Sequence, residues 1–459
     1  EPYRRQRQMC IRDSTTIVAT AILLAGWQLF AVIANQPELI PSLPRLVRTL
    51  CEWLVSGSFY QSVGATILRG ILGMSISFVC AIGMAGLFAR FEWVYELFRP
   101  LLAIMRSIPV ISFILLALIF LNPESIPLMI AFLTMFPLLT ENLTRGILDL
   151  RPGLSIMARQ FHIKRSNVLF QIIYPQLKPF LYSGLASAAG FGWRAIIMGE
   201  VLSQCAFGIG SEMKRAQNFI AVPELLAWTI VAVFISFFFD KGISKVTDIT
   251  PKISFANEDQ TIPTPTLSVL DTKDISYQYG IQHFSHSFQK GIIYGISAPS
   301  GKGKTTLLNL IGGILLPTEG EIHPTRHFGI ATIFQQPQLL PYLTAEENII
   351  LPLSSFLTEE KARRIAQKHL QEMEMEPFGN RYPKELSYGQ QQRIAIARAL
   401  AYPSPLLLMD EPFKGLDEAL SHRIIERIRE KQMKEERIIL FTSHNPDEIR
   451  LLADEVIYL

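Results

Sequence analysis

A run of eight residues near the middle of the chain has the composition needed to bind phosphate groups. The run reads Ala298-Pro299-Ser300-Gly301-Lys302-Gly303-Lys304-Thr305 and continues into Thr306. It lies between an apolar stretch at 291–297, which predicts a buried strand, and a helical pattern at 306–314. Glycines 301 and 303 let backbone N–H groups approach phosphates, Lys304 adds positive charge, and the Thr305 hydroxyl can bind Mg²⁺. The segment therefore predicts an ATP site.

Two carboxylates follow a second apolar strand. The strand at 406–409 ends in Asp410 and Glu411. Because the carboxyl ends of neighbouring parallel strands meet at one edge of a sheet, these acids are expected near Lys304. We predict that Asp410 helps to hold Mg²⁺ through water and that Glu411 polarises the attacking water as the general base.

Three further segments carry side chains that suit the same site. The segment Leu386-Ser387-Tyr388-Gly389-Gln390 opens a predicted helix, whose N-terminal N–H groups can hold a γ-phosphate presented by another subunit. Gln335 ends the strand GIATIFQ, and His444 follows another strand in FTSH. Taken singly, Gln335 suits a strand end and His444 a helix cap. The order of all these segments along one chain favours the functional interpretation.

From Ser268 to Leu459 these segments resemble the ATPases of the ABC family. The resemblance implies that Gln335 contacts Mg²⁺ and relays to the membrane domain, and that His444 contacts the γ-phosphate. It further implies nucleotide contacts by Ser387, Gly389 and Gln390, adenine stacking by Tyr279 with Tyr277 as a rival, and a dimer contact by Asp417. The chain departs from the family pattern at Ala298, Tyr388, Lys414 and Gly415, which stand where Gly, Gly, Ser and Ala are common.

The first half of the chain predicts helices that cross a membrane. Of the 459 residues, 49% are hydrophobic, and nearly all of the excess lies before Lys241. A spanning helix needs about 20 mostly apolar residues, because only a backbone with all its hydrogen bonds made is stable in hydrocarbon. Six segments fit this description, at 15–34, 63–88, 101–121, 126–140, 180–202 and 221–239. The fourth is short and contains Pro127 and Pro137, so we expect it to be kinked.

The positions of Lys and Arg predict the orientation of these spans. With the N-terminus inside, the inner loops hold most of the positive charge and the outer loops hold only Arg45, Arg48, Lys214 and Arg215. An even number of spans then delivers the second half to the cytoplasm, which predicts a multi-pass protein of the cytoplasmic membrane. Residues 1–14 begin without Met and lack a signal-peptide cleavage site, so their origin stays open and residue 15 begins a retained span.

Charge and cysteine content exclude other classes of function. The net charge of +3 is small, and no basic stretch interleaves with aromatic residues, so nucleic acid is not a predicted partner. The cysteines at 10, 51, 80 and 205 are widely spaced and form no CxxC pair, which argues against a disulfide framework or a metal site.

The longest predicted inner loop, 141–178, contains the amphipathic segment MARQFHIKRSNVLFQIIYP, which is too polar to span and ends at Pro175. It resembles the cytoplasmic loop of ABC importer permeases, with Ala158 and Pro175 matching the family pattern and His162 in the place of its Gly. The resemblance implies a coupling helix seated on the ATPase; an amphipathic surface helix is an equally weighted alternative. Residues 99–109 and 190–210 resemble the nitrate, sulfonate and taurine branch of these permeases. Permeases for thiamine-precursor pyrimidines are similar, so the solute stays open.

Two charged residues fall inside the fifth predicted span. Arg194 and Glu200 are costly in lipid and are expected to face the bundle interior or a water-filled path. They suit either a translocation path or, with somewhat more weight, an interhelix ion pair or hydrogen bond.

The chain is thus predicted to join an all-α membrane domain at 15–246, through a polar linker at 247–268, to an α/β P-loop ATPase at 269–459. The predicted function is ATP-driven solute import by two identical copies, with ATP and Mg²⁺ as cofactors and an external solute-binding protein as partner. An ABC exporter half and a membrane-anchored ABC ATPase without transport are the alternatives. The compact inner loops argue against the exporter.

Overall fold

The computed structural model describes residues 18–19, 21–247, 252–260, 267–278, 280–299, 301–324 and 329–459, with the backbone alone at 246–247. The chain folds as two compact units. The first comprises Glu1–Asp149 and Leu177–Ile249, and the second comprises Leu150–Gln176 and Thr250–Leu459. The loop that the sequence places on the inner side of the membrane therefore belongs with the second unit.

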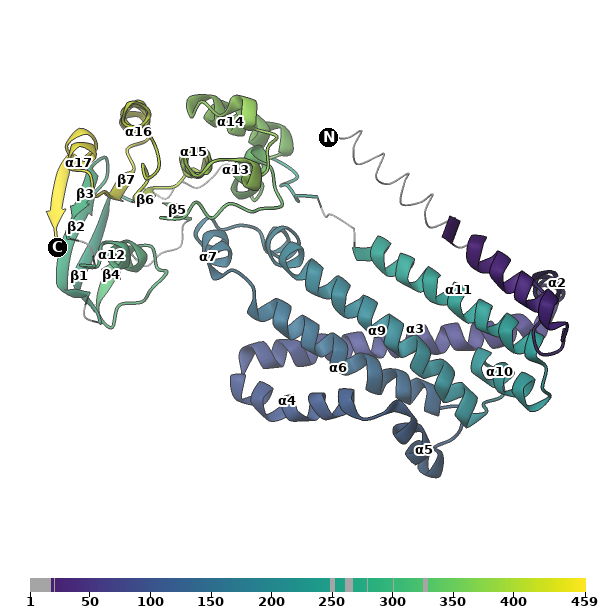
Figure 1. The fold of residues 1–459 in the computed structure, drawn as a ribbon. Coiled ribbons are helices and arrows are strands. Elements are labelled where there is room, and N and C mark those ends of the chain that lie inside the picture. Colours follow the sequence, from purple (N-terminus) through teal and green to yellow (C-terminus); the bar gives the residue numbers. More distant parts are fainter. Residues whose placement is uncertain are drawn as a thin grey trace. The chain divides into compact units, whose positions relative to one another are not determined.

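The first unit is helical throughout its described residues (Figure 1). After an apolar helix at Ala21–Ala34, its helices are α2 (Leu43–Trp53), α3 (Gly57–Arg90), α4 (Glu92–Ser107), α5 (Val110–Phe120), α6 (Ile126–Leu148), most of α9 (Tyr174–Ser203), α10 (Ile209–Asn218) and α11 (Val222–Thr247). Helix α3 buries a stripe of small side chains, and a Cβ added at Gly73 would lie 2.7 Å from the Cβ of Ala131 in α6. Small residues let two helix backbones approach closely where lipid supplies no hydrophobic force.

The long apolar helices agree with the predicted spans in all but one case. Within the described residues, four helices are long and apolar enough to cross a membrane, and the first predicted span is represented by the shorter helix Ala21–Ala34. The third predicted span, 101–121, is wrong as a single helix, because α4 and α5 meet at an angle of 94°. Pro109 lacks an N–H group and forces Ile108 into an extended conformation with ψ 129, which ends α4. The fourth span is longer than predicted, since α6 continues through Pro137 to Leu148.

The second unit contains two sheets. Strands β1 (Val269–Tyr277), β2 (Ile281–Gln289) and β4 (Glu319–His323) form an antiparallel sheet in the order β2-β1-β4. Strands β3 (Ile293–Ser297), β5 (Ala331–Ile333), β6 (Leu406–Asp410), β7 (Ile438–Thr442) and β8 (Glu455–Tyr458) form a parallel sheet in the order β5-β6-β7-β3-β8. Together they confirm the predicted α/β class.

Helices of the second unit cover the parallel sheet on both sides (Figure 1). They are α7 (Pro152–Gln160), α8 (Arg165–Asn167), α12 (Lys304–Ile311), α13 (Ala345–Leu353), α14 (Glu359–Glu372), α15 (Tyr388–Ala401), α16 (Glu418–Glu435) and α17 (Pro446–Leu452), with short turns at Glu376–Phe378 and Pro383–Glu385. Alternate residues of β6 point to opposite faces, so Leu406 and Leu408 pack toward α12 while Leu407 and Met409 pack toward α15.

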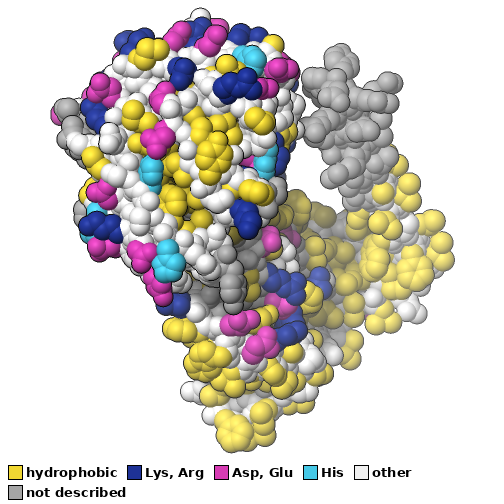
Figure 2. All heavy atoms as spheres, turned by 90° about the vertical axis from the view of Figure 1, so that its left-hand side faces the viewer, with side chains coloured by type: hydrophobic (Ala, Val, Ile, Leu, Met, Phe, Trp, Pro, Cys, Tyr) yellow, Lys and Arg dark blue, Asp and Glu magenta, His cyan; other side chains and the backbone are white. Residues whose placement is uncertain are grey.

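The surfaces of the two units differ in composition. Charged side chains of both signs are scattered over the visible face of the second unit, whereas hydrophobic side chains dominate much of the visible surface of the helical unit (Figure 2). Many large apolar side chains of the helical unit are exposed, among them Ile119 at 73% and Phe120 at 76%. An exposed apolar surface of this extent is typical of helices that face lipid.

Candidate nucleotide site and coupling loop

The phosphate loop follows β3 and leads into α12. Gly301 and Gly303 have φ values of 81° and 88°, in the left-handed region that a residue with a Cβ rarely adopts. A Cβ at Gly303 would also lie 2.8 Å from the carbonyl oxygen of Gly280. Position 303 therefore requires glycine for two independent reasons.

Lys304 is a buried cation at the start of α12. Only 8% of the residue is exposed, its Nζ donates to the carbonyl oxygen of Ala298 at 2.6 Å, and it lies 3.5 Å from Nδ1 of His444. A single carbonyl does not neutralise an ammonium group, so this arrangement keeps a positive charge inside the loop where phosphate oxygens would bind. Of the other predicted residues of the loop, Lys302 is exposed and Thr306 is half-buried.

Asp410 ends β6 beside the phosphate loop, as predicted. Its Oδ2 accepts a hydrogen bond from Thr305 Oγ1 at 2.9 Å, and its Oδ1 accepts one from Thr442 Oγ1 at 2.8 Å. Burial raises the pKa of Asp410, while these two hydrogen bonds work in the opposite direction. Thr442, at the end of β7, was not identified from the sequence.

The pair of Thr305 and Asp410 suits Mg²⁺. A hydroxyl and a carboxylate in contact supply hard oxygen ligands, and Mg²⁺ commonly takes its remaining ligands from water and substrate phosphates. Across the described residues, no cluster of three His, Cys, Asp or Glu side chains could hold a metal alone. The side-chain oxygens therefore fit a magnesium ion that arrives with nucleotide.

Glu411 brings together the residues predicted to act on the γ-phosphate. His444 Nε2 lies 3.0 Å from its Oε1, Lys414 Nζ lies 3.2 Å from its Oε2, and the side chain of Gln335 also donates a hydrogen bond to it. Burial alone would raise the pKa of Glu411, but the hydrogen bond and charge of Lys414, the bond from Gln335 and the nearby His444 outweigh it and lower the pKa. The carboxylate is thus held ionised.

The backbone of Glu411 is strained. Its φ is 48°, and its N–H group donates to Thr442 Oγ1 at 3.0 Å. A non-glycine residue in the left-handed region costs of order 1–3 kcal/mol and persists only where its surroundings hold it. Because of this conformation, the chain turns away from β6 at Glu411, directly after the end of the strand.

The signature segment begins α15 with a reciprocal cap. Ser387 Oγ accepts from Gln390 N at 3.3 Å, and Gln390 Oε1 accepts from Ser387 N at 2.9 Å. Gly389 lies against the loop after Glu411, because a Cβ there would be 2.7 Å from the carbonyl oxygen of Gly415. The predicted helix N-terminus at this segment is confirmed; its contact with nucleotide remains a prediction.

Asp417 caps α16 in this chain. Its Oδ1 accepts from Leu420 N at 2.9 Å. This cap neither requires nor excludes the predicted dimer contact. Two other predicted residues, Tyr279 and Ser300, lie outside the described residues. Tyr277, the rival for adenine stacking, ends β1 and packs partly buried against the core around α12.

Three of the departures from the family pattern lie together. The hydroxyl of Tyr388 donates to the carbonyl oxygen of Gln335 at 2.8 Å. Gly415 has a φ of 80°, and a Cβ there would lie 2.8 Å from Cδ1 of Tyr388. Lys414 precedes Gly415 and contacts Glu411. The sequence marked these positions only as departures; it did not reveal that they contact one another and the predicted base.

The loop 150–176 is part of the core of the second unit. Leu154, Met157, Ala158 and Phe161 are all buried in one cluster with side chains of α13, α14 and α15. The backbone is joined as well, because Gln160 O accepts from Ile330 N at 2.8 Å and Gln160 Nε2 donates to Gly312 O at 2.7 Å. Helix α7 is amphipathic, since Ser155 and Arg159 are exposed, and its buried face forms part of the core of the second unit, as expected of the predicted coupling helix.

Phe161 is the centre of this contact. It has no exposed surface, meets the ring of Tyr402 edge-on with 5.1 Å between centroids, and lies 5.4 Å from Cζ of Arg398. Arg398 is itself buried and donates to the carbonyl oxygens of Pro337 and Gln338, each at 2.8 Å. Burial lowers the pKa of Arg398 to about 9. The guanidinium thus connects the loop after Gln335 to the coupling helix.

His162, which stands where the family pattern has glycine, has a backbone conformation that favours glycine. Its φ is 46°, in the left-handed region. The amphipathic segment that ends at Pro175 continues into the next membrane helix without a break. A π-helical stretch at Val168–Ile173 leads directly into α9, which continues through Pro175 to Ser203. Proline is tolerated in the first turn of a helix, where its missing N–H group costs little.

The described part of the predicted linker is bound to the second unit. Asn167 pairs with both backbone groups of Ser254, and further along Ala256 N donates to Ser354 O at 3.0 Å and Gln260 N donates to Phe356 O at 2.9 Å. Asp259 Oδ1 accepts from both the N–H and the hydroxyl of Thr358. Residues 252–260 of the predicted linker therefore fold with the second unit and do not lie between the two units as a separate segment.

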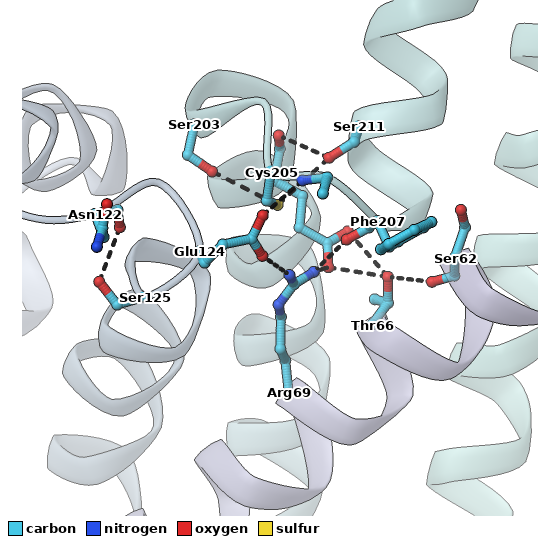
Figure 3. Close-up of polar contacts among 12 residues, drawn as sticks. Ser62, Thr66, Arg69, Asn122, Glu124, Ser125, Ser203, Cys205, Phe207 and Ser211 are labelled. Carbon is cyan, nitrogen blue, oxygen red and sulfur yellow. Dashed lines mark hydrogen bonds and ion pairs between the residues drawn. The ribbon is translucent and has the colours of Figure 1, made fainter.

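The two charged residues of the fifth span lie in different surroundings. Glu200 is fully buried, as predicted, and accepts hydrogen bonds from Arg69 Nη1 at 2.8 Å, from Thr66 and from Gly210 N. Arg69 also pairs with Glu124, which joins α3 to the loop before α6 (Figure 3). Arg194 is exposed on the helical unit, so the prediction that it faces the interior is wrong within this chain. The sequence did not identify Arg69 as the partner of Glu200.

Two family models match the chain in separate regions. Residues 63–240 match the binding-protein-dependent transport system inner membrane component, and residues 281–414 match the ABC transporter model. The first range falls within the helical half and also includes the coupling loop. The second includes the phosphate loop, the signature segment and Glu411.

Curated relatives match the second half. An ABC transporter ATP-binding protein of Methanocaldococcus jannaschii is 34% identical over 201 residues, which are 39% of this chain and 85% of the relative. An Fe(3+) ions import ATP-binding protein of Rhizobium etli and a glucose import ATP-binding protein of Saccharolobus solfataricus are each 35% identical; the chain spans about half of their lengths, 54% and 52%. In each case the match covers 37–39% of this chain.

A solved structure of the Methanocaldococcus cassette, a dimeric post-hydrolysis state bound to ADP and Pi, is 32% identical, covers 41% of this chain and 94% of its own, and has a TM-score of 0.39. The two family models, the relative covered over most of its length and the site geometry agree. The chain belongs to the ABC transporter family and joins, in one polypeptide, a multi-pass permease of the binding-protein-dependent type to an ABC ATPase domain that binds and hydrolyses ATP.

Proposed function

We propose that two copies of this chain form an importer that uses ATP hydrolysis to move a small solute inward across the cytoplasmic membrane. The observation that carries the proposal is the burial of Phe161 and its neighbours, which lie between membrane helices in the sequence, in the core of the ATPase unit. A loop built into that core moves with it. Movement of the ATPase is thereby transmitted to the helices on either side of the loop.

The import direction has support from two sources. The model that matches the helical half describes a binding-protein-dependent inner membrane component, and the relatives of the second half include import proteins for Fe(3+) ions, glucose and spermidine/putrescine. An extracytoplasmic solute-binding protein is the partner that such a permease requires. Because these relatives are named for different solutes, similarity of the ATPase half supports no choice among solutes.

The composite nucleotide site requires a second copy. In this chain Ser387 and Gln390 bond to each other at the N-terminus of α15, and Lys304 is held by Ala298 and His444. We propose that the partner's α15 N-terminus completes each site by donating N–H groups to the γ-phosphate, with Asp417 at the dimer contact. Tyr279 is proposed to stack on adenine.

The chain's own residues would act as follows. Gly301, Gly303 and Lys304 bind the phosphates, Glu411 orients and deprotonates the attacking water, and His444 contacts the γ-phosphate. Mg²⁺, when bound with ATP, would neutralise charge on the phosphate oxygens, and Thr305, Asp410 and Gln335 would hold it. The side chain of Gln335 contacts Glu411, and its carbonyl oxygen accepts a hydrogen bond from Tyr388. The loop that follows Gln335 is bound by Arg398, which also lies against Phe161 of the coupling helix segment. Gln335 is therefore suited to report nucleotide binding.

The solute class follows from the permease resemblance. Nitrate, sulfonates, taurine and thiamine-precursor pyrimidines are the candidates. Each is small and polar.

The experiment is uptake into liposomes that contain the full chain, with ATP on the side of the ATPase and each candidate solute supplied with a candidate binding protein. We expect uptake that depends on ATP and on the binding protein, and loss of uptake in E411Q. ATP-driven movement out of the cytoplasmic side without a binding protein would identify an exporter instead. ATP hydrolysis that no solute or binding protein stimulates, without any solute movement, would contradict transport.

A further inference from the structure

Lys414 contacts the predicted general base although the family pattern has a serine in its place. Its Nζ lies 3.2 Å from Oε2 of Glu411, while His444 lies 3.0 Å from Oε1. Lys414 and His444 thus each contact one of the two oxygens of the carboxylate. The side chain of Glu411 is 15% exposed and that of Lys414 is 51% exposed, so the pair lies at the edge of the site.

The turn that carries Lys414 is fixed from several sides. Lys414 N donates to Glu411 O at 3.2 Å, and Leu416 N donates to Phe413 O at 3.1 Å. Phe413 is 2% exposed and anchors the turn in the core of the ATPase unit. These contacts fix the backbone of the turn from which the lysine side chain extends to the carboxylate.

Tyr388 covers the other end of the same turn. Its ring lies against Gly415, where the φ of 80° and a Cβ distance of 2.8 Å to Cδ1 of Tyr388 both require glycine. Its hydroxyl bonds to the carbonyl oxygen of Gln335, whose side chain in turn donates to Glu411. The chain of contacts therefore returns to the carboxylate from which it began. Tyr388 and Gly415 fit each other, whereas the Cβ of an alanine at 415, the residue common in the family, would lie too close to the ring of Tyr388.

We propose that Lys414 is a positioning residue for the carboxylate of Glu411, and that Tyr388 and Gly415 fix the turn that carries it. The proposal rests on the proposed role of Glu411 as the base. When His444 turns to the γ-phosphate, Oε1 of Glu411 becomes free to accept a proton from water. Lys414 remains on Oε2 and keeps the carboxylate plane in place. A displacement of about 1 Å in a reacting group can reduce a rate by up to about 100-fold, so this restraint affects turnover directly.

The test is steady-state ATP hydrolysis by the full chain in lipid, comparing wild type, K414M and K414R. We expect kcat to fall about 10-fold in K414M with KM for ATP changed less than about twofold, because the lysine orients the base without contacting nucleotide. K414R should recover at least half of the lost kcat, since it restores a cation that reaches Oε2. G415A, which displaces the ring of Tyr388, should reduce kcat in the same manner.

K290M is the matched control. Lys290 forms an exposed ion pair with Glu436 at 2.8 Å and lies at the end of β3 opposite the phosphate loop. Its removal should leave both constants unchanged. Retained binding of a fluorescent ATP analogue by K414M and K414R shows that the variants are folded.

Other outcomes overturn the inference. A raised KM with unchanged kcat in K414M would make Lys414 a nucleotide contact. A loss that K414R does not reverse, or no change at all, would remove it as a positioning residue. If the wild-type chain itself fails to hydrolyse ATP, the proposed function is wrong, and that result is distinct from failure of this inference.

Discussion

The side-chain amide of Asn167 forms hydrogen bonds with both the N–H and the carbonyl group of Ser254. Its Oδ1 accepts from Ser254 N at 2.8 Å, and its Nδ2 donates at 2.8 Å both to Ser254 O and to Ser354 Oγ. One buried side chain thus joins the coupling loop, the segment that follows the last membrane helix and the loop after α13. The fusion of permease and ATPase therefore passes directly over the coupling loop.

N167A should release this junction. Leaving the backbone groups of Ser254 without their partner costs about 1–3 kcal/mol, so the amide of Ser254 should exchange with deuterium markedly faster in the full chain. The amide of Ala256, which donates to the carbonyl oxygen of Ser354, is an internal control and should change less. Unchanged exchange at Ser254 would show that other contacts hold the segment.

F161A should destabilise the ATPase unit. Removing a fully buried aromatic ring costs about 3–5 kcal/mol, and Phe161 has no exposed surface. Thermal unfolding of the detergent-solubilised protein measures the loss. F170A, in the same loop at a residue that is 45% exposed, is the control and should change stability by about 0.5 kcal/mol or less. Equal effects of the two variants would contradict the central position of Phe161.

E411Q should separate binding from turnover. The amide keeps the shape of the side chain but cannot accept the proton of water, so ATP hydrolysis should fall at least about 100-fold while ATP binding is retained. Radiolabelled ATP binding and phosphate release measure the two steps. E436Q, at an exposed site, should leave both unchanged. Persistent hydrolysis in E411Q would assign the base to another group.

E200A should destabilise the helical unit by about 3–5 kcal/mol, because it leaves the charge of Arg69 without its buried partner. The double variant R69A/E200A should recover much of this loss, since both buried charges are then removed and only the exposed Glu124 loses a partner. R194A is the control, because Arg194 is exposed, and its effect should stay within about 0.5 kcal/mol. Thermal unfolding in detergent distinguishes the three. An additive double variant would show that the pair is not coupled.

His369 should make the ATPase unit sensitive to acid. Burial, followed by the positive charges of Lys431, Lys368 and Arg437, lowers its pKa to about 3, although the Glu372 carboxylate lies 2.7 Å from Nδ1. In the unfolded chain the histidine has a pKa near 6.5. Between pH 6.5 and 3 this histidine is therefore protonated in the unfolded chain but neutral in the folded protein. Stability is complete above pH 6.5 and falls as the pH is lowered.

Lowering the pH from 7.5 to 5 should reduce the free energy of unfolding by about 2 kcal/mol because of this histidine. Thermal unfolding across that range measures the slope, and H369Q, which cannot take up a proton, should reduce it. If the slope is the same in H369Q, Glu372 stabilises the protonated ring in the folded protein.

The site could be predicted largely from sequence because its residues stand at strand ends. Gln335, Glu411 and His444 each follow a strand of one parallel sheet, and parallel strands that end together bring such residues to one edge without further information. The same argument placed Asp410 beside Thr305. The fold class followed from the same periodicity.

The unpredicted contacts depend on how elements pack. Arg69 and Glu200 are 131 positions apart, and their pairing requires the rotation of α3 against α9, which apolar composition does not encode. Lys414 was visible only as an unusual residue, since its distance from Glu411 depends on the turn that Gly415 and Tyr388 shape. Pro109 was visible in the sequence as a residue that can interrupt a helix, but the sequence did not indicate the angle between α4 and α5.

Helix α9 belongs to both units, since its residues Tyr174–Gln176 fold with the second and the remainder with the first. The two units are therefore joined at this point by a continuous helix and not by a loop. The wide π-helical turns at Val168–Ile173, directly before this shared helix, contain an extra residue per hydrogen-bonded ring and can exchange with tighter turns. A one-residue change in helical register there would advance the helix by about 1.5 Å, a stroke that needs no hinge between the halves.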